Sequence, residues 1–301
     1  MYKYHNLNPI SQVGLDEFTK DYAPVSTPET ADAILVRSAA MHEMEFAPDL
    51  KAIARAGAGV NNIPLEKCAE QGIVVFNTPG ANANGVKELV IAGMLLASRD
   101  IIGGINWVQE NEEDGNIAKD AEKAKKAFAG QELEGKKLGV IGLGAIGVLV
   151  ANAATHLGMD VYGYDPYVSV DSAWRLSRSI HHTTNVDEIY ENCDYITVHV
   201  PLTPDTKGTF NADAFNLMQK GTTIINFARA ELVDNDALFD ALETGVVKRY
   251  ITDFGTEDLL NKPNVTVFPH VGGSTGEAEL NCAIMAGQTI RRFMETGEIV
   301  N

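Results

Sequence analysis

The stretch KKLGVIGLGAIG, residues 136–147, decides the fold. Its apolar run Leu138–Ile141 leads into Gly142, Gly144 and Gly147, and a helical pattern follows as far as Leu157. A strand, a turn with GxGxxG spacing and a helix form the first unit of a dinucleotide-binding sheet. There the first glycine permits the tight turn, the second admits a pyrophosphate, and the third lets the helix pack on the strand. The helix N-terminus then directs free N–H groups at the phosphates.

The next predicted strand supports the same interpretation and indicates which dinucleotide binds. It covers Val161–Tyr164 and ends at Asp165, about 20 residues past the glycines, where a carboxylate accepts hydrogen bonds from ribose hydroxyls. That carboxylate would repel the 2′-phosphate of NADP, and Pro166 and Tyr167 follow it instead of an arginine. The sequence therefore predicts NAD as the cofactor.

Outside this unit, short apolar runs alternate with longer helical patterns. The other runs are Ile34–Val36, Ala52–Ala54, Ile73–Phe76, Tyr195–Val200, Thr223–Phe227, Tyr250–Thr252 and Val265–Phe268. Runs of this length, rich in Val and Ile, are typical of buried strands, and their alternation with helices predicts an α/β fold with parallel sheets covered on both faces. A long helical segment is expected from about Gly85 to Gln109. The polar stretch Glu110–Gly130 after it is expected to be either a surface excursion or a helix that wraps a partner subunit.

Composition limits the class of protein. The 301 residues suffice for two domains, and 45% hydrophobic with 22% charged residues is typical of a soluble globular protein. We see no apolar run of about 18 residues and no signal peptide, so we expect a cytoplasmic protein that spans no membrane. Cys68, Cys193 and Cys282 are too scattered for a zinc site and are expected to be reduced thiols, with no bound metal. The net charge of −17 argues against nucleic acid as a partner.

Three later strands each end in polar residues, at the edge where open α/β sheets place their ligands. Arg229, Glu257 and His270 follow the runs that end at Phe227, Thr252 and Phe268. His270 is suited to take a hydroxyl proton, because imidazole titrates near neutral pH. Glu257 could bond its second ring nitrogen, and the planar fork of Arg229 can bind a carboxylate with two hydrogen bonds. The sequence thus favours NAD-dependent oxidation of a 2-hydroxy acid.

These segments together resemble the D-isomer-specific 2-hydroxy-acid dehydrogenases over nearly the whole chain. The residues that carry the resemblance are Arg55–Ile63, Asn77–Asn84, Asn226–Asp234 and Pro269–Thr275. Within the family, Asn61–Pro64 and Val86–Leu89 are most similar to 3-phosphoglycerate dehydrogenases, the first enzymes of serine synthesis. The resemblance implies oxidation of 3-phospho-D-glycerate to 3-phosphohydroxypyruvate, with hydride passing to the nicotinamide and the proton to His270.

The resemblance also implies how the chain is organised. It gives two doubly wound parallel-sheet domains with the active site in a cleft between them. Residues 1–97 and 278–301 would form a flavodoxin-like substrate domain, and residues 98–277 a Rossmann NAD domain. A homodimer is expected to form through the helix that joins the domains.

Further site residues follow from the resemblance. The expected substrate contacts are Arg37, which would reach a substrate phosphate, and Ala58, Gly59, Val60 and Asn82. The expected cofactor contacts, besides the three glycines and Asp165, are Ala145, Ile146, His199, Val200, Pro201, Thr206, Ala228, Asp253, Gly272 and Gly273.

Some alternatives stay open. The family's usual spacing from Asp253 places the catalytic acid at Asp258, but we favour Glu257 because its longer side chain reaches an imidazole more easily. The substrate could instead be hydroxypyruvate, glyoxylate or pyruvate, and an NAD-sensing binding protein like the family's corepressors is a more remote alternative. The chain stops where many relatives continue into a regulatory ACT-type domain, so either the protein is a short form or the sequence was trimmed.

Overall fold

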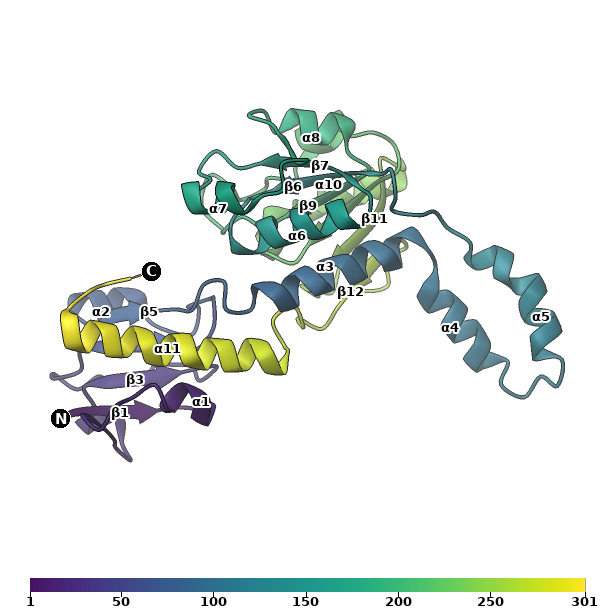
Figure 1. The fold of residues 1–301 in the computed structure, drawn as a ribbon. Helices are drawn as coiled ribbons and strands as arrows, with labels where there is room; N and C mark the ends of the chain where they lie inside the picture. Colours follow the sequence, from purple (N-terminus) through teal and green to yellow (C-terminus); the bar gives the residue numbers. More distant parts are fainter. Residues whose placement is uncertain (301) are drawn as a thin grey trace. The chain divides into compact units, whose positions relative to one another are not determined.

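The computed structural model describes residues 1–300, which divide into two compact units (Figure 1). One consists of Met1–Gly85 and Gly273–Asn301, and the other of Val86–Gly272. The units change over at 85/86 and 272/273, whereas the sequence-based domain boundaries lie at 97/98 and 277/278. That assignment of functional domains stays a prediction.

The first unit contains a five-stranded parallel sheet with the order β2-β1-β3-β4-β5. Its strands are β1 (Tyr2–Asn6), β2 (Tyr22–Pro24), β3 (Ala33–Val36), β4 (Ala52–Arg55) and β5 (Val74–Phe76). This order is that of the flavodoxin-like doubly wound fold. All four residues of β3 are buried, as expected of a strand that is covered on both faces.

Alternate residues of β3 enter two different cores. Leu35 packs in a cluster with Ile290 of the last helix, α11 (Gly276–Thr296), whereas Ile34 and Val36 pack in a cluster with Cys68. Successive side chains of a strand point to opposite faces, so this division places a helix layer on each side of the sheet. The layers of this unit are α11 with α1 (Gln12–Leu15), and α2 (Leu65–Glu70).

The second unit contains a seven-stranded sheet with the order β12-β11-β10-β9-β6-β7-β8, again all parallel. Its strands are β6 (Lys137–Ile141), β7 (Asp160–Tyr164), β8 (His181–His182), β9 (Tyr195–Val198), β10 (Thr222–Asn226), β11 (Val247–Thr252) and β12 (Val265–Val267). The order reverses between β6 and β9, as in the Rossmann fold, and ligands bind at the carboxyl ends of strands beside such a switch point.

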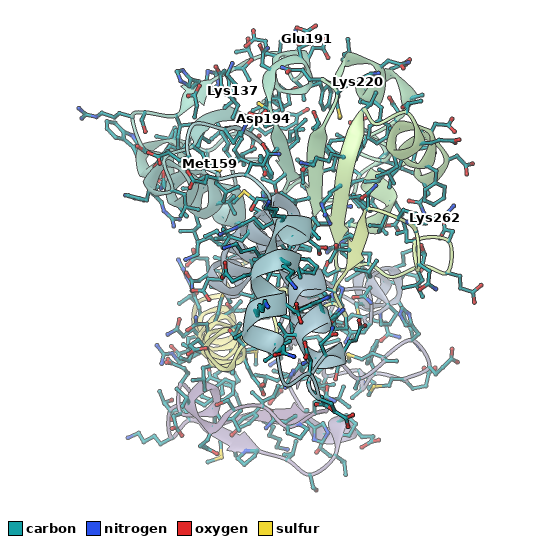
Figure 2. The ribbon with its side chains drawn as sticks, turned by 90° about the vertical axis from the view of Figure 1, so that its right-hand side faces the viewer. Lys137, Met159, Glu191, Asp194, Lys220 and Lys262 are labelled. Atoms are coloured by element: carbon teal, nitrogen blue, oxygen red, sulfur yellow. The ribbon has the colours of Figure 1, made fainter. Side chains whose placement is uncertain are left out.

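The amino ends of the central strands lie on the opposite side of the sheet from these carboxyl ends. Lys137, Asp194 and Lys220 mark the amino ends (Figure 2). There the Asp194 carboxylate accepts a hydrogen bond from the backbone N–H of Lys137 at 2.8 Å, and the N–H of Asp194 donates to the carbonyl of Lys137 at 3.0 Å. These two bonds fix the register of β6 against β9. The polar residues predicted for the site all follow the opposite, carboxyl ends.

The helices of the second unit are α3 (Ala83–Ser98, which begins in the first unit), α4 (Ile101–Glu110), α5 (Ile117–Ala124), α6 (Ala145–His156), α7 (Val170–Arg175), α8 (Asp187–Asn192), α9 (Ala212–Leu217) and α10 (Asn235–Glu243). The expected single helical segment from 85 to 109 is therefore two helices. Asp100 separates them, because its side chain caps α4 by accepting from the N–H of Gly103 at 3.0 Å. In the described part of the chain, no helix is both long and apolar enough to cross a lipid bilayer.

Three strands were not expected from the sequence. β1 lies between β2 and β3, but its residues alternate between polar and aromatic, so it lacks the continuous apolar run by which the other strands were found. β2 and β8 are short edge strands of three and two residues. Both residues of β8 are exposed, and His181 stacks on Tyr162 with ring centroids 4.8 Å apart.

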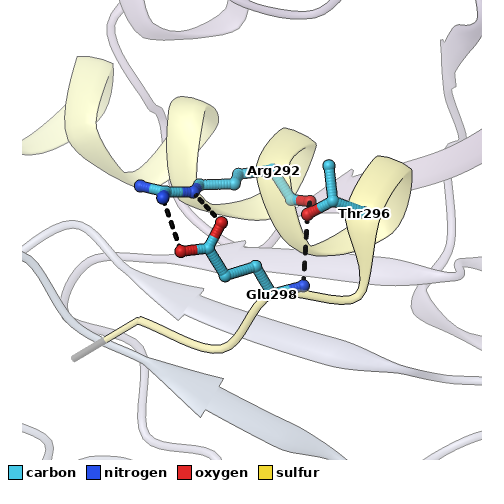
Figure 3. A network of polar contacts seen from close by, with 3 residues as sticks. All are labelled: Arg292, Thr296 and Glu298. Carbon is cyan, nitrogen blue, oxygen red and sulfur yellow. Dashed lines mark hydrogen bonds and ion pairs between the residues drawn. The ribbon is translucent and has the colours of Figure 1, made fainter.

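The C-terminal end of α11 is closed by a small polar network (Figure 3). Gly297 terminates the helix in the left-handed conformation at φ 73°, which returns the chain toward the last turn. The Arg292 guanidinium then donates to both carboxylate oxygens of Glu298, from Nε at 2.6 Å and from Nη2. Thr296 completes the network by accepting from the Glu298 N–H at 3.2 Å.

Candidate cofactor and substrate sites

The glycine-rich turn after β6 has the shape that its spacing predicts. Gly142 adopts φ 93°, and a side chain there would lie 2.8 Å from the carbonyl of His199, so conformation and space both require glycine. A Cβ on Gly147 would lie 1.9 Å from the Gly142 carbonyl oxygen, which is why helix α6 can pack directly against the turn. These two contacts fix the start of α6 close to the end of β6.

The space in front of α6 fits a phosphate group. Gly144 is the N-cap residue, no side chain caps the helix, and no atom lies within 4 Å of the position that a Cβ on Gly144 would take. Gly144 and Ala145 are exposed, whereas Gly147 is buried. The first N–H groups of this 12-residue helix therefore face open space at the positive end of its dipole.

Asp165 lies beside this turn and helps to hold it. Its Oδ2 accepts from the N–H of Leu143 at 2.8 Å, and its Oδ1 accepts from the N–H of Tyr167 at 2.8 Å. Each carboxylate oxygen has two lone pairs, so each keeps one acceptor position for a ribose hydroxyl. Asp165 thus has a structural contact to the glycine turn in addition to its predicted ribose contact.

His199 follows β9 and closes the other side of the turn. Its N–H donates to the carbonyl of Ile141 at 2.7 Å, and its Nε2 lies 3.0 Å from the Thr197 hydroxyl. Nδ1 is buried and has no hydrogen-bond partner in the protein. Burial lowers the pKa of the ring from 6.5 to about 3, so His199 is neutral at physiological pH. A neutral ring with an open nitrogen suits contact with an uncharged ligand group.

The loop after His199 is organised by Thr206. The Thr206 hydroxyl donates to the carbonyl of Pro201 at 2.6 Å and accepts from the N–H of Thr203 at 2.8 Å. Val200 lies against the glycine turn, since its Cγ1 would be 3.0 Å from a Cβ on Gly142. His199, Val200, Pro201 and Thr206 therefore form one loop beside the glycine turn, and their contact with the nucleotide stays a prediction.

Arg229 follows β10 in a turn that Asn226 organises. The Asn226 Oδ1 accepts from the N–H groups of Ala228 at 3.1 Å and Arg229 at 3.3 Å, and its Nδ2 donates to the carbonyl of Arg229 at 2.8 Å. The Arg229 side chain is exposed and its Nη1 donates to the carbonyl of Ala228 at 2.6 Å. Asn226 was not predicted as a site residue, although an asparagine within the apolar run Thr223–Phe227 was a signal in the sequence. The structure buries it completely, and a buried amide needs hydrogen-bond partners.

Asp253, after β11, is a buried carboxylate. Only 4% of it is exposed, its Oδ2 accepts from the N–H of Gly272 at 3.4 Å, and its Oδ1 has no partner in the protein. Burial raises the pKa of Asp253, while the charges of His270 and Arg229 and the Gly272 hydrogen bond act to lower it. The structure thus brings Asp253, Arg229 and His270 into one electrostatic neighbourhood at the carboxyl edge of the sheet.

His270 follows β12 and holds an unusual backbone conformation. Its φ of 52° lies in the left-handed region, where non-glycine residues are uncommon and often functional. The exposed ring packs edge-on against Phe254 with centroids 5.2 Å apart. Imidazole access to solvent and to a ligand is compatible with a role in proton transfer.

The expected acid partner of His270 is not in contact with it. Glu257 and Asp258 are both exposed, and among residues 1–300 no hydrogen bond or ion pair joins either of them to His270. Asp258 instead accepts from the Asn235 Nδ2 at 2.8 Å, and hydrogen bonds from Thr256 and Asn235 lower its pKa. The choice between Glu257 and Asp258 stays a prediction. In the described residues no cluster of His, Cys, Asp or Glu could hold a metal ion.

The first unit contains a cavity of about 330 Å³ where β3, β4 and α11 begin or end. Of the predicted substrate contacts, Arg37 and Asn82 line it, together with Gly57. Ala58, Gly59 and Val60 are not among its lining residues. A Cβ on Gly273 would lie 2.6 Å from the Asn82 amide, so glycine lets the start of the α11 segment approach Asn82 closely.

Comparison with known proteins decides the family. Residues 91–272 match the model described as "D-isomer specific 2-hydroxyacid dehydrogenase, NAD binding domain". The chain belongs to this family. Its NAD-binding domain therefore contains the glycine turn, Asp165 and the Arg229, Asp253 and His270 group described above.

Proteins similar to this chain include D-3-phosphoglycerate dehydrogenases. That of Methanocaldococcus jannaschii is 37% identical over 278 residues, which cover 89% of this chain and 51% of the relative. That of Bacillus subtilis is 35% identical over 274 residues, which cover 88% of this chain and 50% of the relative. The chain thus spans about half the length of the curated relatives it matches.

Solved structures agree with the family assignment. NAD⁺-bound 3-phosphoglycerate dehydrogenase of Entamoeba histolytica superposes with a TM-score of 0.74 at 26% identity, covering 99% of this chain and 96% of the other. A glyoxylate reductase from Paecilomyes thermophila superposes with a TM-score of 0.82 at 22% identity, covering 100% and 97%. The second likeness supports the two-sheet α/β fold, which the sequence predicted.

The residues present fit NAD in this member of the family. The open position before Gly144 admits the pyrophosphate, and Asp165 keeps lone pairs for the ribose. The carboxylate oxygen Oδ1 of Asp253 and the ring nitrogen Nδ1 of His199 both lack a hydrogen-bond partner in the protein. Bound NAD would supply the hydride acceptor for alcohol oxidation, and the chain's own residues would bind, orient and exchange the proton.

Proposed function

We propose that the protein is an NAD-dependent dehydrogenase that interconverts 3-phospho-D-glycerate and 3-phosphohydroxypyruvate, the first step of serine biosynthesis. The observation that carries this proposal is the cation Arg37 in the cavity of the first unit, in a chain with an NAD-binding domain. A phosphate ester has three acceptor oxygens and about −1.5 to −2 charges near pH 7, and arginine binds such groups with two parallel hydrogen bonds.

In oxidation, bound NAD would supply the acceptor for the hydride of C2 of the hydroxy acid, and His270 takes the hydroxyl proton. Arg229 binds the substrate carboxylate, because its exposed guanidinium is held on the turn that Asn226 organises. Glu257, or Asp258, is proposed to orient His270 once substrate is bound. Apo geometry is often looser than that of the reacting complex, so the lack of a contact in the described structure is compatible with this role.

The remaining substrate contacts are proposed on the family pattern. Gly57 lines the cavity, and the backbone N–H groups from Gly57 to Val60 are proposed to hold the substrate carboxylate. We also propose that two copies assemble through the helical segment that contains α3 and α4. Ile101, Ile102, Ile105 and Val108 of α4 are exposed apolar residues, which supports an interface on this helix.

A second candidate function has one observation in its favour. Arg37 is already paired with Glu279, at 2.6 Å from Nη1 to Oε1, so its charge is neutralised in the protein itself. A site without net positive charge would suit an unphosphorylated keto acid such as hydroxypyruvate or glyoxylate. The two candidates differ in the part that Arg37 plays.

Replacement of Arg37 by methionine separates them. For the phosphorylated substrate we expect KM to rise about tenfold or more, because a hydrogen-bonded charge pair of about 1.5–3 kcal/mol is lost, with little change for hydroxypyruvate. The readout is NADH absorbance with 3-phosphohydroxypyruvate and hydroxypyruvate as alternative substrates. Equal effects on the two substrates would favour the second candidate.

A further inference from the structure

The ion pair of Arg37 and Glu279 lies inside the cavity that the proposed function assigns to the substrate phosphate. Arg37 comes from the end of β3 and Glu279 from the first turn of α11, and both line the cavity. The Nη1–Oε1 distance is 2.6 Å, and the two side chains are 50% and 45% exposed. The Glu279 carboxylate thus contacts the same guanidinium group that would bind the substrate phosphate.

The surroundings of the pair attract anions. Helix α11 has 21 residues and its N-terminus faces the cavity through Gly276, Ala278 and Glu279. Its dipole and the guanidinium of Arg37 both favour negative charge at this place. The carboxylate of Glu279 is therefore held by the same two features that would hold a phosphate.

The backbone of Arg37 is held by two hydrogen bonds that do not involve its guanidinium. The Arg37 N–H donates to the Asn8 side chain at 3.0 Å, and its carbonyl accepts from the Arg55 Nε at 3.0 Å. These bonds position the residue at the cavity, and the guanidinium can exchange its partner without breaking them.

The contact of Arg37 with Glu279 has fewer hydrogen bonds than the pair of Arg292 and Glu298 near the other end of α11. Arg292 donates from two nitrogens to both oxygens of Glu298 (Figure 3). By contrast, one nitrogen of Arg37 contacts one oxygen of Glu279. Half-exposed pairs of this kind contribute little free energy, so a stronger anion can replace the carboxylate at low cost.

We propose that Glu279 is a displaceable counter-anion of Arg37, which competes with the phosphate of the substrate for the guanidinium. In the free protein Glu279 neutralises Arg37. A phosphate ester, with its higher charge and two-point geometry, displaces Glu279, whereas a hydroxymethyl group has no charge with which to do so. This inference rests on the proposed function and adds the residue that competes with the substrate phosphate for Arg37.

Glu279→Gln tests the inference, because glutamine keeps the size and removes the charge. We expect KM for 3-phosphohydroxypyruvate to fall about two- to fivefold, the range of an exposed ion pair, with kcat and the KM for hydroxypyruvate unchanged. In an Arg37→Met background the same change should have no effect on either KM, because the cation for which the two anions compete is gone.

Glu277→Gln is the matched control. Glu277 lies on the same first turn of α11 and carries the same charge, but it does not line the cavity. It should leave both KM values unchanged. A rise in the KM for the phosphorylated acid in Glu279→Gln would overturn the proposal, since Glu279 would then position Arg37 for substrate. Equal changes in Glu277→Gln and Glu279→Gln would also overturn it, since only the overall charge would matter.

A binding measurement keeps this inference separate from the proposed function. Inorganic phosphate is titrated against the melting temperature of the wild-type protein and Glu279→Gln. A lower phosphate concentration for half-maximal stabilisation in Glu279→Gln supports displacement, even if the protein turns over no phosphorylated acid and the proposed function fails. Equal phosphate responses of the two proteins would contradict it.

Discussion

Asn226 holds Arg229 through both backbone groups of that residue: its Oδ1 accepts from the Arg229 N–H at 3.3 Å, and its Nδ2 donates to the Arg229 carbonyl at 2.8 Å. Asn226 is completely buried at the end of β10, so the position of the exposed Arg229 side chain depends on an amide in the core. This relation connects the packing of the sheet to the residue proposed to bind the substrate carboxylate.

Replacing Asn226 by alanine should therefore affect substrate binding and stability together. It removes three hydrogen bonds of the arginine turn, each with a net contribution of about 0.5–1.5 kcal/mol, from groups that are partly buried. We expect a lower melting temperature and a KM for the keto acid at least tenfold higher. Asn226→Asp keeps the acceptor and should retain more of the affinity. An unchanged KM in Asn226→Ala would separate the turn from carboxylate binding.

His270→Ala should abolish turnover but spare the cofactor. General base catalysis is typically worth about 10²–10⁴ in rate, so kcat should fall by that factor. NADH affinity, measured by fluorescence titration, should stay close to that of the wild type, because the phosphate turn lies on β6 and α6. Near-normal turnover in this variant would remove His270 from the proposed mechanism.

Asp165 should select NAD over NADP by charge. Asp165→Asn removes the charge and retains an oxygen that can accept from Leu143, so it preserves the glycine turn better than Asp165→Ala. We expect NADH to bind more weakly and NADPH more tightly in Asp165→Asn, because the 2′-phosphate no longer meets a carboxylate. Both dissociation constants are measured by fluorescence titration. Equal losses for the two nucleotides would count against the ribose role.

The identity of the acid that assists His270 is open to a paired test. If Glu257 stabilises the protonated imidazole, Glu257→Gln should move the acidic limb of the kcat/KM profile for oxidation of the hydroxy acid to lower pH. The reason is that the neutral imidazole, which acts as the base in this direction, then persists to lower pH. Asp258→Asn should leave that limb in place. The reverse result, with only Asp258→Asn shifting the profile, would assign the role to Asp258 in line with the family's usual spacing.

Asp253 should cost stability at neutral pH. Burial raises its pKa above the unfolded value of 3.8, so the folded state binds the proton more tightly, and the penalty for burying the charge is present above the folded pKa and disappears as pH falls below it. Asp253→Asn should raise the unfolding free energy at pH 7 by roughly 1 kcal/mol and weaken NADH binding. Thermal melts from pH 4 to 8 measure the first effect. A lower melting temperature at pH 7 would mean that His270 and Arg229 hold the carboxylate favourably.

Much of the fold followed from local patterns. Runs such as Leu138–Ile141 are buried on both faces of a parallel sheet, so their hydrophobicity is continuous and visible in the sequence. β1 escaped because only Tyr4 of its five residues is buried, and its place in the sheet depends on pairing with β2 and β3. The break at Asp100 depended on a capping hydrogen bond, which a helical periodicity does not reveal.

The candidate site was predicted where residue type and strand end coincide, as at Arg229 and His270, whereas Asp253 was predicted from the resemblance to the family. The pair of Arg37 and Glu279 could not be predicted in that way, because 242 residues separate them and neither position has a local signal for the other. They meet because α11 returns to the first unit and packs against β3 and β4. The contact of Asp165 with Leu143 was likewise set by the turn after β6 rather than by spacing.

The most direct test of the account is the ratio of kcat/KM for 3-phosphohydroxypyruvate to that for hydroxypyruvate, measured by loss of NADH absorbance. If Arg37 binds a substrate phosphate, the phosphorylated acid should be preferred about tenfold or more, since one charge-assisted hydrogen bond is worth at least that factor. A ratio near or below one, with turnover of the unphosphorylated acid, would contradict phosphoglycerate as the substrate and assign the protein to another keto acid.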